Sequence, residues 1–244
     1  MVIYKSRDRI IMGVFALIKE DFSVAYNNDP ASQSRIELLF SYPGVWALFW
    51  HRISHPLFKR GFKRTARFLM AVAHFLTHID IHPGASIGRR VFIDHGTGIV
   101  IGETAIIADD VLIYQGVTLG GVSLKKGKRH PTIEKGVVLG AGAKILGNIT
   151  IGEYSKIGAN SVVIKKVPAH STAVGIPARV VDKGKCTNPM SHNKLPDVDK
   201  EMFEYLLKRV AVLEHVLTKD NEEIIEQDSE LEHIYERFIK SMKS

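Results

Sequence analysis

The sequence has a single cysteine, Cys186, among its 244 residues. One thiol cannot build an internal disulfide framework, and such scarcity is typical of proteins in a reducing compartment. Long apolar runs are also missing: residues 10–18 are apolar but lie between Arg9 and the charged residues 19–21, without a small-residue cleavage site. We therefore expect a cytoplasmic protein with no signal peptide and no membrane-spanning helix.

The sequence also lacks a zinc finger, an aromatic–basic RNA-binding module and a convincing basic recognition helix. Its net charge of +7 is compatible with nucleic acid or with an anionic cofactor as a partner. Without a recognition module, nucleic acid is the weaker choice, and we expect no nucleic-acid partner. Hydrophobic residues make up 45% of the chain and charged residues 24%, which is typical of a globular protein with a substantial core.

The first 78 residues have the apolar spacing of helices. One apolar face is formed by residues 10, 11, 14, 15 and 18. Pro30 disfavours helical geometry at Asp29, so this helix is expected to break within NNDP, residues 27–30. Helix-like stretches follow at 34–41, 44–60 and 62–78, separated at Pro43 and Gly61. An N-terminal helical domain over residues 1–78 is predicted.

A six-residue repeat occupies residues 79–183. Thirteen aliphatic residues recur in it, often followed by glycine, and all but two of the intervals are six residues long. A period of six fits neither an α-helix nor a hairpin. It fits a coil of three short strands, each with one aliphatic side chain pointing inward, and roughly four to five such coils are predicted. The positions are Ile81, Ile87, Ile93, Ile101, Ile107, Ile113, Leu119, Ile133, Leu139, Ile145, Ile151, Ile157 and Val163.

The two longer intervals both contain histidine. The interval of eight residues holds DHGTG, residues 94–98, and the interval of fourteen ends in RHP, residues 129–131. In coil geometry, Asp80 precedes the first strand and residues 94–100 follow the third, so both lie along one corner of the coil. We expect Asp80 to reach His95 there, which predicts a proton-transfer site at an edge that a second subunit could close.

Several motifs occur together in a fixed order: NNDPAS, DIHPGASIG, IDHGTGIVIGETA, YQGVTLGG, GKRHP, LGAGAKILGNITIG and VGIPARVV. Over roughly residues 10–183 they resemble the serine O-acetyltransferases of the hexapeptide-repeat acyltransferase superfamily. The resemblance implies an α+β protein in which the helical domain precedes a left-handed parallel β-helix, an exception to the usual right-handed crossover. It also implies a homotrimer or a dimer of trimers with active sites between neighbouring prisms. Its substrates would be acetyl-CoA and L-serine, with no metal required and with cysteine as a feedback inhibitor.

The implied reaction needs a base that removes the proton of the serine hydroxyl as the oxygen attacks the thioester. His95 is the candidate, because the pKa of histidine lies near working pH. The resemblance and the coil geometry place Asp80 at the second ring nitrogen, where an acid fixes the tautomer and stabilises the imidazolium. His82, next to Pro83, is expected to be structural.

Serine is a zwitterion and therefore needs an anion beside its ammonium group and a cation beside its carboxylate. Asp29 and Asp94 are predicted to supply the anions, and Arg129 to bind the carboxylate through its planar fork. His130 is expected to contact the substrate and to share the proton transfer. A sugar or another hydroxylated acceptor is the first alternative, but a neutral acceptor needs no paired ion sites.

The second alternative is a zinc-binding β-helix protein or a non-catalytic scaffold. Zinc would require three converging histidines. His82, His95 and His130 match that requirement poorly, because His95 already has an acid partner.

No phosphate-binding loop is visible for acetyl-CoA. The resemblance places its pantetheine arm along the prism at Gly121, Ala141 and Ala159, where small residues let backbone groups approach. Positions 141 and 159 are eighteen residues apart, one full coil, so these alanines are expected to stack. Lys156 is a candidate for the phosphates, with an ordinary surface lysine as the alternative.

Residues 184–244 depart from the family pattern. A heptad of apolar residues predicts helix from about Asp199 to 242, comprising Phe203, Val210, Leu217, Ile224, Leu231 and Phe238. A three-stranded coiled coil and a helical hairpin that turns at 219–221 both fit this pattern. The last residue is Ser244, whereas the resemblance implies a terminal isoleucine for binding the sulfhydrylase that follows in the pathway. A complex with that enzyme is therefore doubtful.

Overall fold

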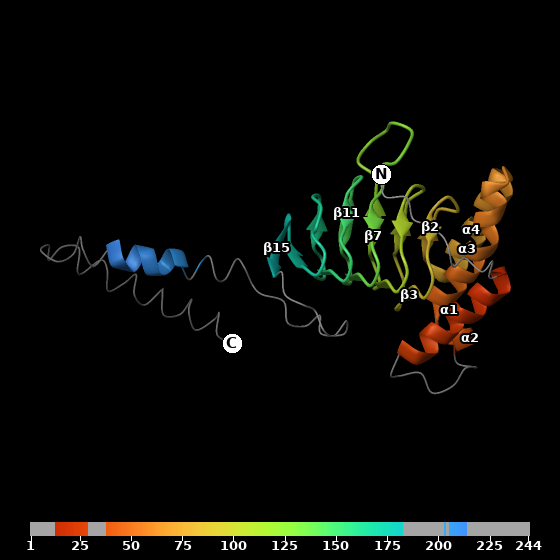
Figure 1. The fold of residues 1–244 in the computed structure, drawn as a ribbon, viewed down its shortest axis with the longest axis horizontal. Helices are drawn as coiled ribbons and strands as arrows, with labels where there is room; N and C mark the ends of the chain where they lie inside the picture. The colour runs from red at the N-terminus through yellow and green to blue at the C-terminus, as the bar shows by residue number, and fades with distance from the viewer. Residues whose placement is uncertain (1–12, 29–37, 183–202, 204, 214–244) are drawn as a thin grey trace, which may run out of the picture. The chain divides into compact units, whose positions relative to one another are not determined.

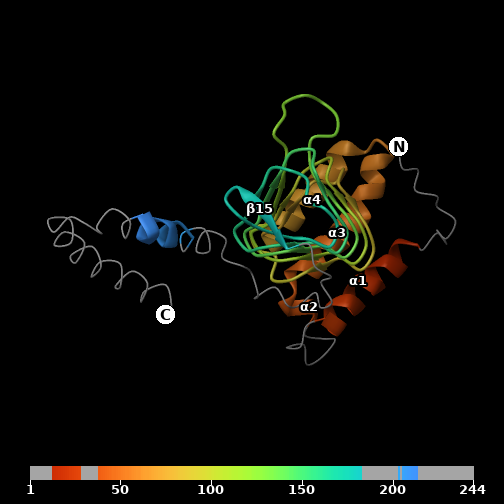
Figure 2. The same ribbon diagram turned by 60° about the vertical axis from the view of Figure 1, so that its left-hand side comes forward.

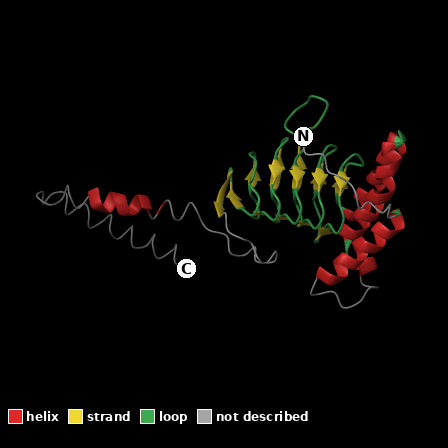
Figure 3. Cartoon of the chain, viewed as in Figure 1, coloured by secondary structure: helices red, strands yellow, loops and turns green. Residues whose placement is uncertain are grey.

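The computed structural model describes residues 13–28, 38–182, 203 and 205–213. Its contacts divide the chain into two units, residues 1–195 and 196–244, which are described separately. The first unit begins with helices and continues as a stack of short strands (Figure 3). None of the described helices is long and apolar enough to cross a membrane.

The described residues of the N-terminal part form four helices: α1 (Val14–Asn28), α2 (Leu38–Ser41), α3 (Pro43–Lys59) and α4 (Lys63–Thr77). Pro43 occupies the first turn of α3, where its missing N–H costs no hydrogen bond. The chain then turns at Gly61, whose φ of 93° is readily accessible only to glycine. The helix breaks predicted at Pro43 and Gly61 agree with the structure.

Fifteen short strands follow in the described residues. They are β1 (Asp80–Ile81), β2 (Ser86–Ile87), β3 (Phe92–Ile93), β4 (Val100–Ile101), β5 (Ile106–Ile107), β6 (Leu112–Ile113), β7 (Thr118–Gly120), β8 (Thr132–Ile133), β9 (Val138–Leu139), β10 (Lys144–Leu146), β11 (Thr150–Ile151), β12 (Lys156–Ile157), β13 (Val162–Val163), β14 (Thr172–Gly175) and β15 (Ala178–Asp182).

Every third strand joins the same parallel sheet. The three sheets have the orders β1-β4-β7-β10-β13, β2-β5-β8-β11 and β3-β6-β9-β12-β14-β15, and only the last pair, β14 with β15, is antiparallel. Viewed nearly end-on, successive coils overlie one another as a prism with three faces (Figure 2). The predicted coil of three strands is therefore correct.

The predicted inward aliphatic residues form the core of the prism. Twelve of the thirteen are buried, and Ile87 is partly buried against the same cluster. The strand register places them over one another, as in Ile81 with Ile101 and Ile93 with Ile113. Leu48 of α3 and Met70 of α4 belong to this cluster too, so these helices close the N-terminal end of the prism. Each such buried side chain contributes on the order of 2 kcal/mol.

The segments between strands make three edges of the prism. The His95 edge comprises residues 94–99, 114–117, 140–143 and 158–161, and the His130 edge comprises residues 82–85, 102–105, 121–131 and 147–149. The third edge comprises residues 88–91, 108–111, 134–137 and 152–155. The fourteen-residue interval leaves the prism between β7 and β8 as a projecting loop (Figure 1).

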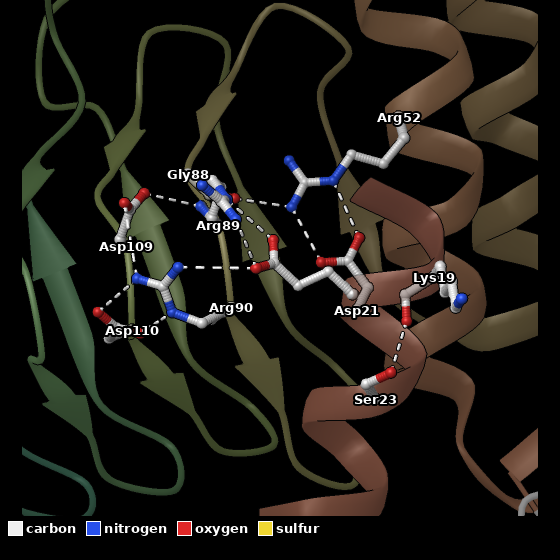
Figure 4. Close-up of polar contacts among 10 residues, drawn as sticks. Lys19, Asp21, Ser23, Arg52, Gly88, Arg89, Arg90, Asp109 and Asp110 are labelled. Atoms are coloured by element: carbon white, nitrogen blue, oxygen red, sulfur yellow. Dashed lines mark hydrogen bonds and ion pairs between the residues drawn. The ribbon is translucent and has the colours of Figure 1, made fainter. Parts of the chain in front are cut away.

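Charged contacts hold α1 against the third edge (Figure 4). Asp21 of α1 receives two hydrogen bonds from the buried Arg52 of α3, at 3.0 and 3.1 Å. The Arg52 guanidinium also donates to the carbonyl oxygens of Ile87 and Gly88, both at 2.7 Å. A buried arginine paired in this way is costly to disrupt, because removal of one partner leaves the other charge unpaired. The network therefore ties α1, through α3, to the start of the third edge.

In the second unit, residues 205–213 are helical, in agreement with the predicted helix from about 199 to 242. Val210, one of the heptad residues, is 47% exposed in the single chain. The rest of that segment, and with it the choice between a coiled coil and a hairpin, lies outside the described residues.

Candidate active site

His95 projects from the prism immediately after β3. Its φ of 59° and the φ of 88° at Gly96 make a left-handed turn. Glycine suits this position because L side chains rarely adopt a φ of 88°, and an added Cβ would also lie 2.4 Å from Cδ1 of Ile79. The His95 side chain is 75% exposed, and its Nε2 lies 3.8 Å from Oδ1 of Asp94. The turn thus presents a solvated imidazole beside a carboxylate.

Asp80 lies on the strand that begins next to this turn. Its N–H donates to the carbonyl of Ile99 at 2.9 Å, and the N–H of Gly98 donates to the carbonyl of His78 at 2.9 Å. The predicted common edge of Asp80 and His95 is therefore present. In the described part of the single chain, however, the acid within ion-pair distance of His95 is Asp94, not Asp80. The outward turn explains the difference, because it carries the imidazole away from the prism.

Tyr114 is a neighbour that the sequence analysis missed. It follows Ile113, which pairs with Ile93, so Tyr114 stands one coil above Asp94. Burial and then the negative charge of Asp94 raise the pKa of the Tyr114 phenol. The sequence already contained the signal for Tyr114, because it lies one coil after Asp94 in the repeat.

Arg129 and His130 occupy the His130 edge. The Nη2 of Arg129 donates to Oε2 of Glu103 at 2.7 Å, and this hydrogen bond lowers the pKa of the Glu103 carboxyl. Burial, followed by the charges of Arg129 and Lys128, lowers the pKa of His130. Only 8% of His130 is exposed.

The preceding coil supports this pair through the sequence Gly102-Glu103-Thr104, which the sequence analysis did not single out. The Thr104 hydroxyl accepts the N–H groups of Arg129 and His130 at 3.0 and 3.1 Å. Gly102 leaves space for the imidazole, because a Cβ there would lie 2.0 Å from Nε2 of His130. The signal in the sequence was a threonine and an acid at the same edge one coil earlier.

The residues proposed to hold acetyl-CoA lie on two edges. Ala141 and Ala159 stack on the His95 edge, as predicted, since the N–H of Asn160 donates to the carbonyl of Ala141 at 2.8 Å. Gly121 lies on the His130 edge, where an added Cβ would be 3.2 Å from Nε2 of His130.

Lys156 differs from one of its two expected roles. The alternative of an ordinary surface lysine is wrong, because only 6% of Lys156 is exposed. Its neighbour Ile157 points into the core, so Lys156 points outward from β12, and its burial on that outer face could not be read from the repeat.

The predicted site residues therefore form two groups in one chain. Asp80, Asp94 and His95 stand where the first sheet begins, and Arg129 and His130 stand where it ends. The six residues from 98 to 103 cross that sheet, and their five steps correspond to about 16 Å of extended chain. Asp29 lies outside the described residues. In the described part of the chain, no cluster of three or more histidine, cysteine, aspartate and glutamate residues could hold a metal ion.

Stacked six-residue repeats with histidine at two edges define a hexapeptide-repeat transferase. The family described as bacterial transferase hexapeptide (six repeats) matches residues 130–165.

More extensive relatives narrow the class. A serine acetyltransferase of Bacillus subtilis (strain 168) is 48% identical over 215 residues, which are 87% of this chain and 99% of that relative. A solved serine acetyltransferase in complex with cysteine is 44% identical with a TM-score of 0.70, covering 72% of this chain and 68% of the other. One in complex with CoA is 45% identical with a TM-score of 0.65, covering 69% and 70%. The chain belongs to the serine acetyltransferase family.

Proposed function

We propose that this chain transfers the acetyl group of acetyl-CoA to the hydroxyl of L-serine at sites that two neighbouring subunits complete. The activity follows from membership of the serine acetyltransferase family. The proposal that two subunits share each site is supported by one observation: the width of a whole sheet separates His95 from His130 within one chain. In a cyclic trimer, the His95 edge of one subunit can face the His130 edge of the next, because every contact in such a ring is heterologous.

His95 acts as the general base in this proposal. Its nitrogen takes the hydroxyl proton while the serine oxygen bonds to the thioester carbon. The resulting tetrahedral intermediate breaks its C–S bond, and the CoA sulfur leaves with the proton returned by His95. Exposure of the imidazole leaves it free to rotate toward Asp80, which would hold the second ring nitrogen.

The remaining charges match a zwitterionic substrate. Asp94, together with Asp29, faces the ammonium group, and Arg129 binds the carboxylate. The bond from Arg129 to Glu103 uses one guanidinium nitrogen and leaves other N–H groups for the ligand. A neutral sugar would leave these charges unpaired, which favours an amino-acid acceptor.

The pantetheine arm of acetyl-CoA is assigned to the same cleft. Ala141 and Ala159 would line it from one subunit and Gly121 from the other. Their small side chains leave backbone N–H and C=O groups within reach of the amides of the arm. Lys156 remains the proposed contact for the phosphates, and its ammonium group would have to reach them from a side chain that is 6% exposed in the single chain.

The finer architecture follows the family. The prism is taken as a left-handed β-helix over residues 79–183, between a helical domain at 1–78 and a helical extension at 184–244. Three extensions would meet near the threefold axis of a trimer or of each half of a hexamer, which lowers the entropic cost of their association. Deletion of residues 187–244 should weaken the trimer and leave the chemistry of His95 unchanged.

Free cysteine is proposed to compete with serine. It carries the same ammonium and carboxylate groups with sulfur in place of oxygen, and a related enzyme has been solved in complex with cysteine. Inhibition by cysteine that excess serine does not relieve would contradict this proposal.

Two experiments test the proposed function. Thiol release from acetyl-CoA should be supported by serine and not by a panel of sugars and other hydroxylated acceptors.

The second experiment tests whether two subunits share each site. His95→Ala and His130→Ala chains are co-expressed with different tags. In a random one-to-one mixture, about one quarter of the sites in cyclic trimers would pair two intact edges and regain activity. No recovery in mixed trimers would show that each site lies within one chain.

A further inference from the structure

The hydrogen bonds around His130 identify which of its ring nitrogens carries a proton. The backbone N–H of Thr104 donates to Nδ1 of His130 at 3.2 Å. A backbone amide can only donate, so Nδ1 must hold a lone pair. A neutral imidazole with a free Nδ1 carries its proton on Nε2.

The Thr104 hydroxyl gives the same answer independently. Its oxygen accepts two backbone N–H groups, those of Arg129 and His130. Its own hydrogen therefore has to point elsewhere, and Nδ1 of His130 lies 2.9 Å from the oxygen. Two donors thus converge on Nδ1, and protonation of that nitrogen would remove both hydrogen bonds.

The surrounding charges also disfavour a protonated ring. Arg129 and Lys128 both lower the pKa of His130, and Glu103 opposes them. Burial is the largest cause, and it too favours the neutral form.

The opposite nitrogen remains available to a ligand. Nε2 lies over Gly102 and beside Gly121, and neither glycine has a side chain to cover it: an added Cβ would lie 2.0 and 3.2 Å away. Two buried side-chain atoms lack a hydrogen-bond partner in the described residues, His51 Nδ1 and Ser54 Oγ. Nε2 of His130 is not one of them, although it makes no hydrogen bond within the described chain. This nitrogen therefore reaches solvent.

We infer that Thr104 is a positioning residue that holds His130 as its Nε2–H tautomer. His130 then donates a hydrogen bond to an oxygen of the bound substrate and does not act as a second base. This inference deepens the proposed function, on which the identity of the substrate rests. It revises the expectation from sequence that His130 shares the proton transfer, and it leaves His95 as the single base.

The tautomer can be measured without substrate. Long-range ¹H–¹⁵N NMR of protein labelled at histidine distinguishes the two tautomers, and the difference spectrum with His130→Gln assigns the signal. We expect a protonated Nε2 and an unprotonated Nδ1 at neutral pH. A protonated Nδ1, in either the other tautomer or the imidazolium, would overturn the inference. A failure to acetylate serine would instead overturn the proposed function, but it would not affect the conclusion that His130 carries its proton on Nε2.

Variants of Thr104 test the control of the ring. Thr104→Val keeps the shape and the backbone N–H but removes the hydroxyl, and kcat/KM for serine should fall about tenfold or more. It should also add a second ionisation to the acid limb of kcat/KM, because Nδ1 becomes able to bind a proton. Thr104→Ser restores the hydroxyl and should recover activity to within about threefold with a single ionisation.

The outcomes separate a specific role from general damage. Thr150→Val, at an exposed strand position, controls for loss of a threonine hydroxyl elsewhere. Equal activity and an equal tautomer in Thr104→Val and the unmodified protein would contradict the inference. Equal loss in Thr104→Val and Thr104→Ser would contradict it too, since the hydroxyl is the group that serine restores.

A pair of His130 variants distinguishes donor from base. The amide nitrogen of glutamine reaches the position of Nε2, whereas that of asparagine reaches the position of Nδ1. His130→Gln keeps a donor in place and should retain about tenfold more kcat/KM than His130→Asn. Because neither amide is a base, equal inactivity of the two variants would favour proton transfer by His130 instead.

Discussion

The His95 edge and the His130 edge present histidine in opposite ways. His95 is 75% exposed and has one acid at 3.8 Å, whereas His130 is 8% exposed and its Nδ1 is held by Thr104. A ring that must accept a proton and return it benefits from freedom to reorient. A ring that binds and orients substrate benefits from preorganisation, because no freedom is lost when the ligand arrives. The two edges therefore suit a division of labour between proton transfer and recognition.

The largest effect is expected from the exposed ring. His95→Ala should lower kcat by a factor on the order of 10²–10⁴, because the base is lost while the prism keeps its core. Steady-state kinetics and thermal unfolding of the same preparation provide the measurement. Turnover near that of the unmodified enzyme in a well-folded variant would remove His95 from the role of base.

The same assay can identify the acid that serves His95. Asp80→Asn should lower kcat, although less than His95→Ala, because it weakens stabilisation of the imidazolium. Asp94→Asn should mainly raise KM for serine, because Asp94 is assigned to the ammonium group. If Asp94→Asn instead lowered kcat and Asp80→Asn raised KM, Asp94 would be the acid that serves His95. That result would agree with the 3.8 Å contact between them in the single chain.

The second effect tests the tight packing of the His130 edge. Gly102→Ala places a methyl group 2.0 Å from the present position of Nε2 of His130, so the ring must move. We expect kcat/KM for serine to fall by a factor of about 10–100. Gly127→Ala on the same edge is the control: its φ is 115°, but nothing lies within 4 Å of the added methyl group. Gly102 does not have a positive φ, so an equal loss in Gly127→Ala, whose methyl group meets nothing, would argue against displacement of His130 as the specific cause.

Substitution of the carboxylate-binding group should have a smaller effect. Arg129→Lys retains the positive charge but loses the planar fork that can hold Glu103 and a carboxylate at once. KM for serine should rise about tenfold, while KM for acetyl-CoA stays nearly constant. Initial rates with each substrate varied in turn would show this. Full activity with serine amide in the unmodified enzyme would contradict the assignment.

The last prediction concerns His51 and the stability of the protein at low pH. Its effect on activity at neutral pH should be the smallest of all. His51 is buried beneath the His130 edge and hydrogen-bonds the carbonyl of Ala85 at 3.1 Å. Burial lowers the pKa of His51 to about 3, from an ordinary 6.5. Above pH 6.5 the ring is neutral in both states. As the pH falls from 6.5 toward 3, His51 takes up a proton in the unfolded chain but not in the native chain. The free energy of unfolding therefore decreases, by roughly a few kcal/mol at most.

Denaturant titrations at pH 7.5 and 5 measure this loss, and hydrogen exchange can localise it. Residues 82–85 on the His130 edge should lose protection before residues 96–99 on the His95 edge. His51→Gln keeps a donor for the carbonyl of Ala85 but cannot titrate, so its stability should depend less on pH. An unchanged pH dependence in that variant would assign the acid sensitivity to other groups, such as His55.

Much of the architecture could be predicted from the order of residues. The six-residue period identified the inward aliphatic residues, and Pro43 and Gly61 marked the helix breaks, because these signals depend on local geometry. The two interruptions of the period located His95 and His130 at edges. The expected stacking of Ala141 on Ala159 required only the length of one coil.

Contacts between coils were harder to predict. Glu103 and Thr104 precede Arg129 and His130 by about a coil, but the projecting loop between β7 and β8 hides that spacing. The burial of Lys156 was missed because a repeat specifies which side chains point inward and is silent about the outer face.

The sequence by itself determined the prism, its core and the family, since each rests on periodic local pattern and on motifs in order. Only the tertiary structure decided that His95 and His130 stand at opposite ends of one sheet, and that Thr104 directs two donors at Nδ1 of His130. The physical reason is that hydrogen bonds act over about 3 Å. The relation of one side chain to another at that scale depends on strand register and on the path of the loop, and neither is expressed in a six-residue period.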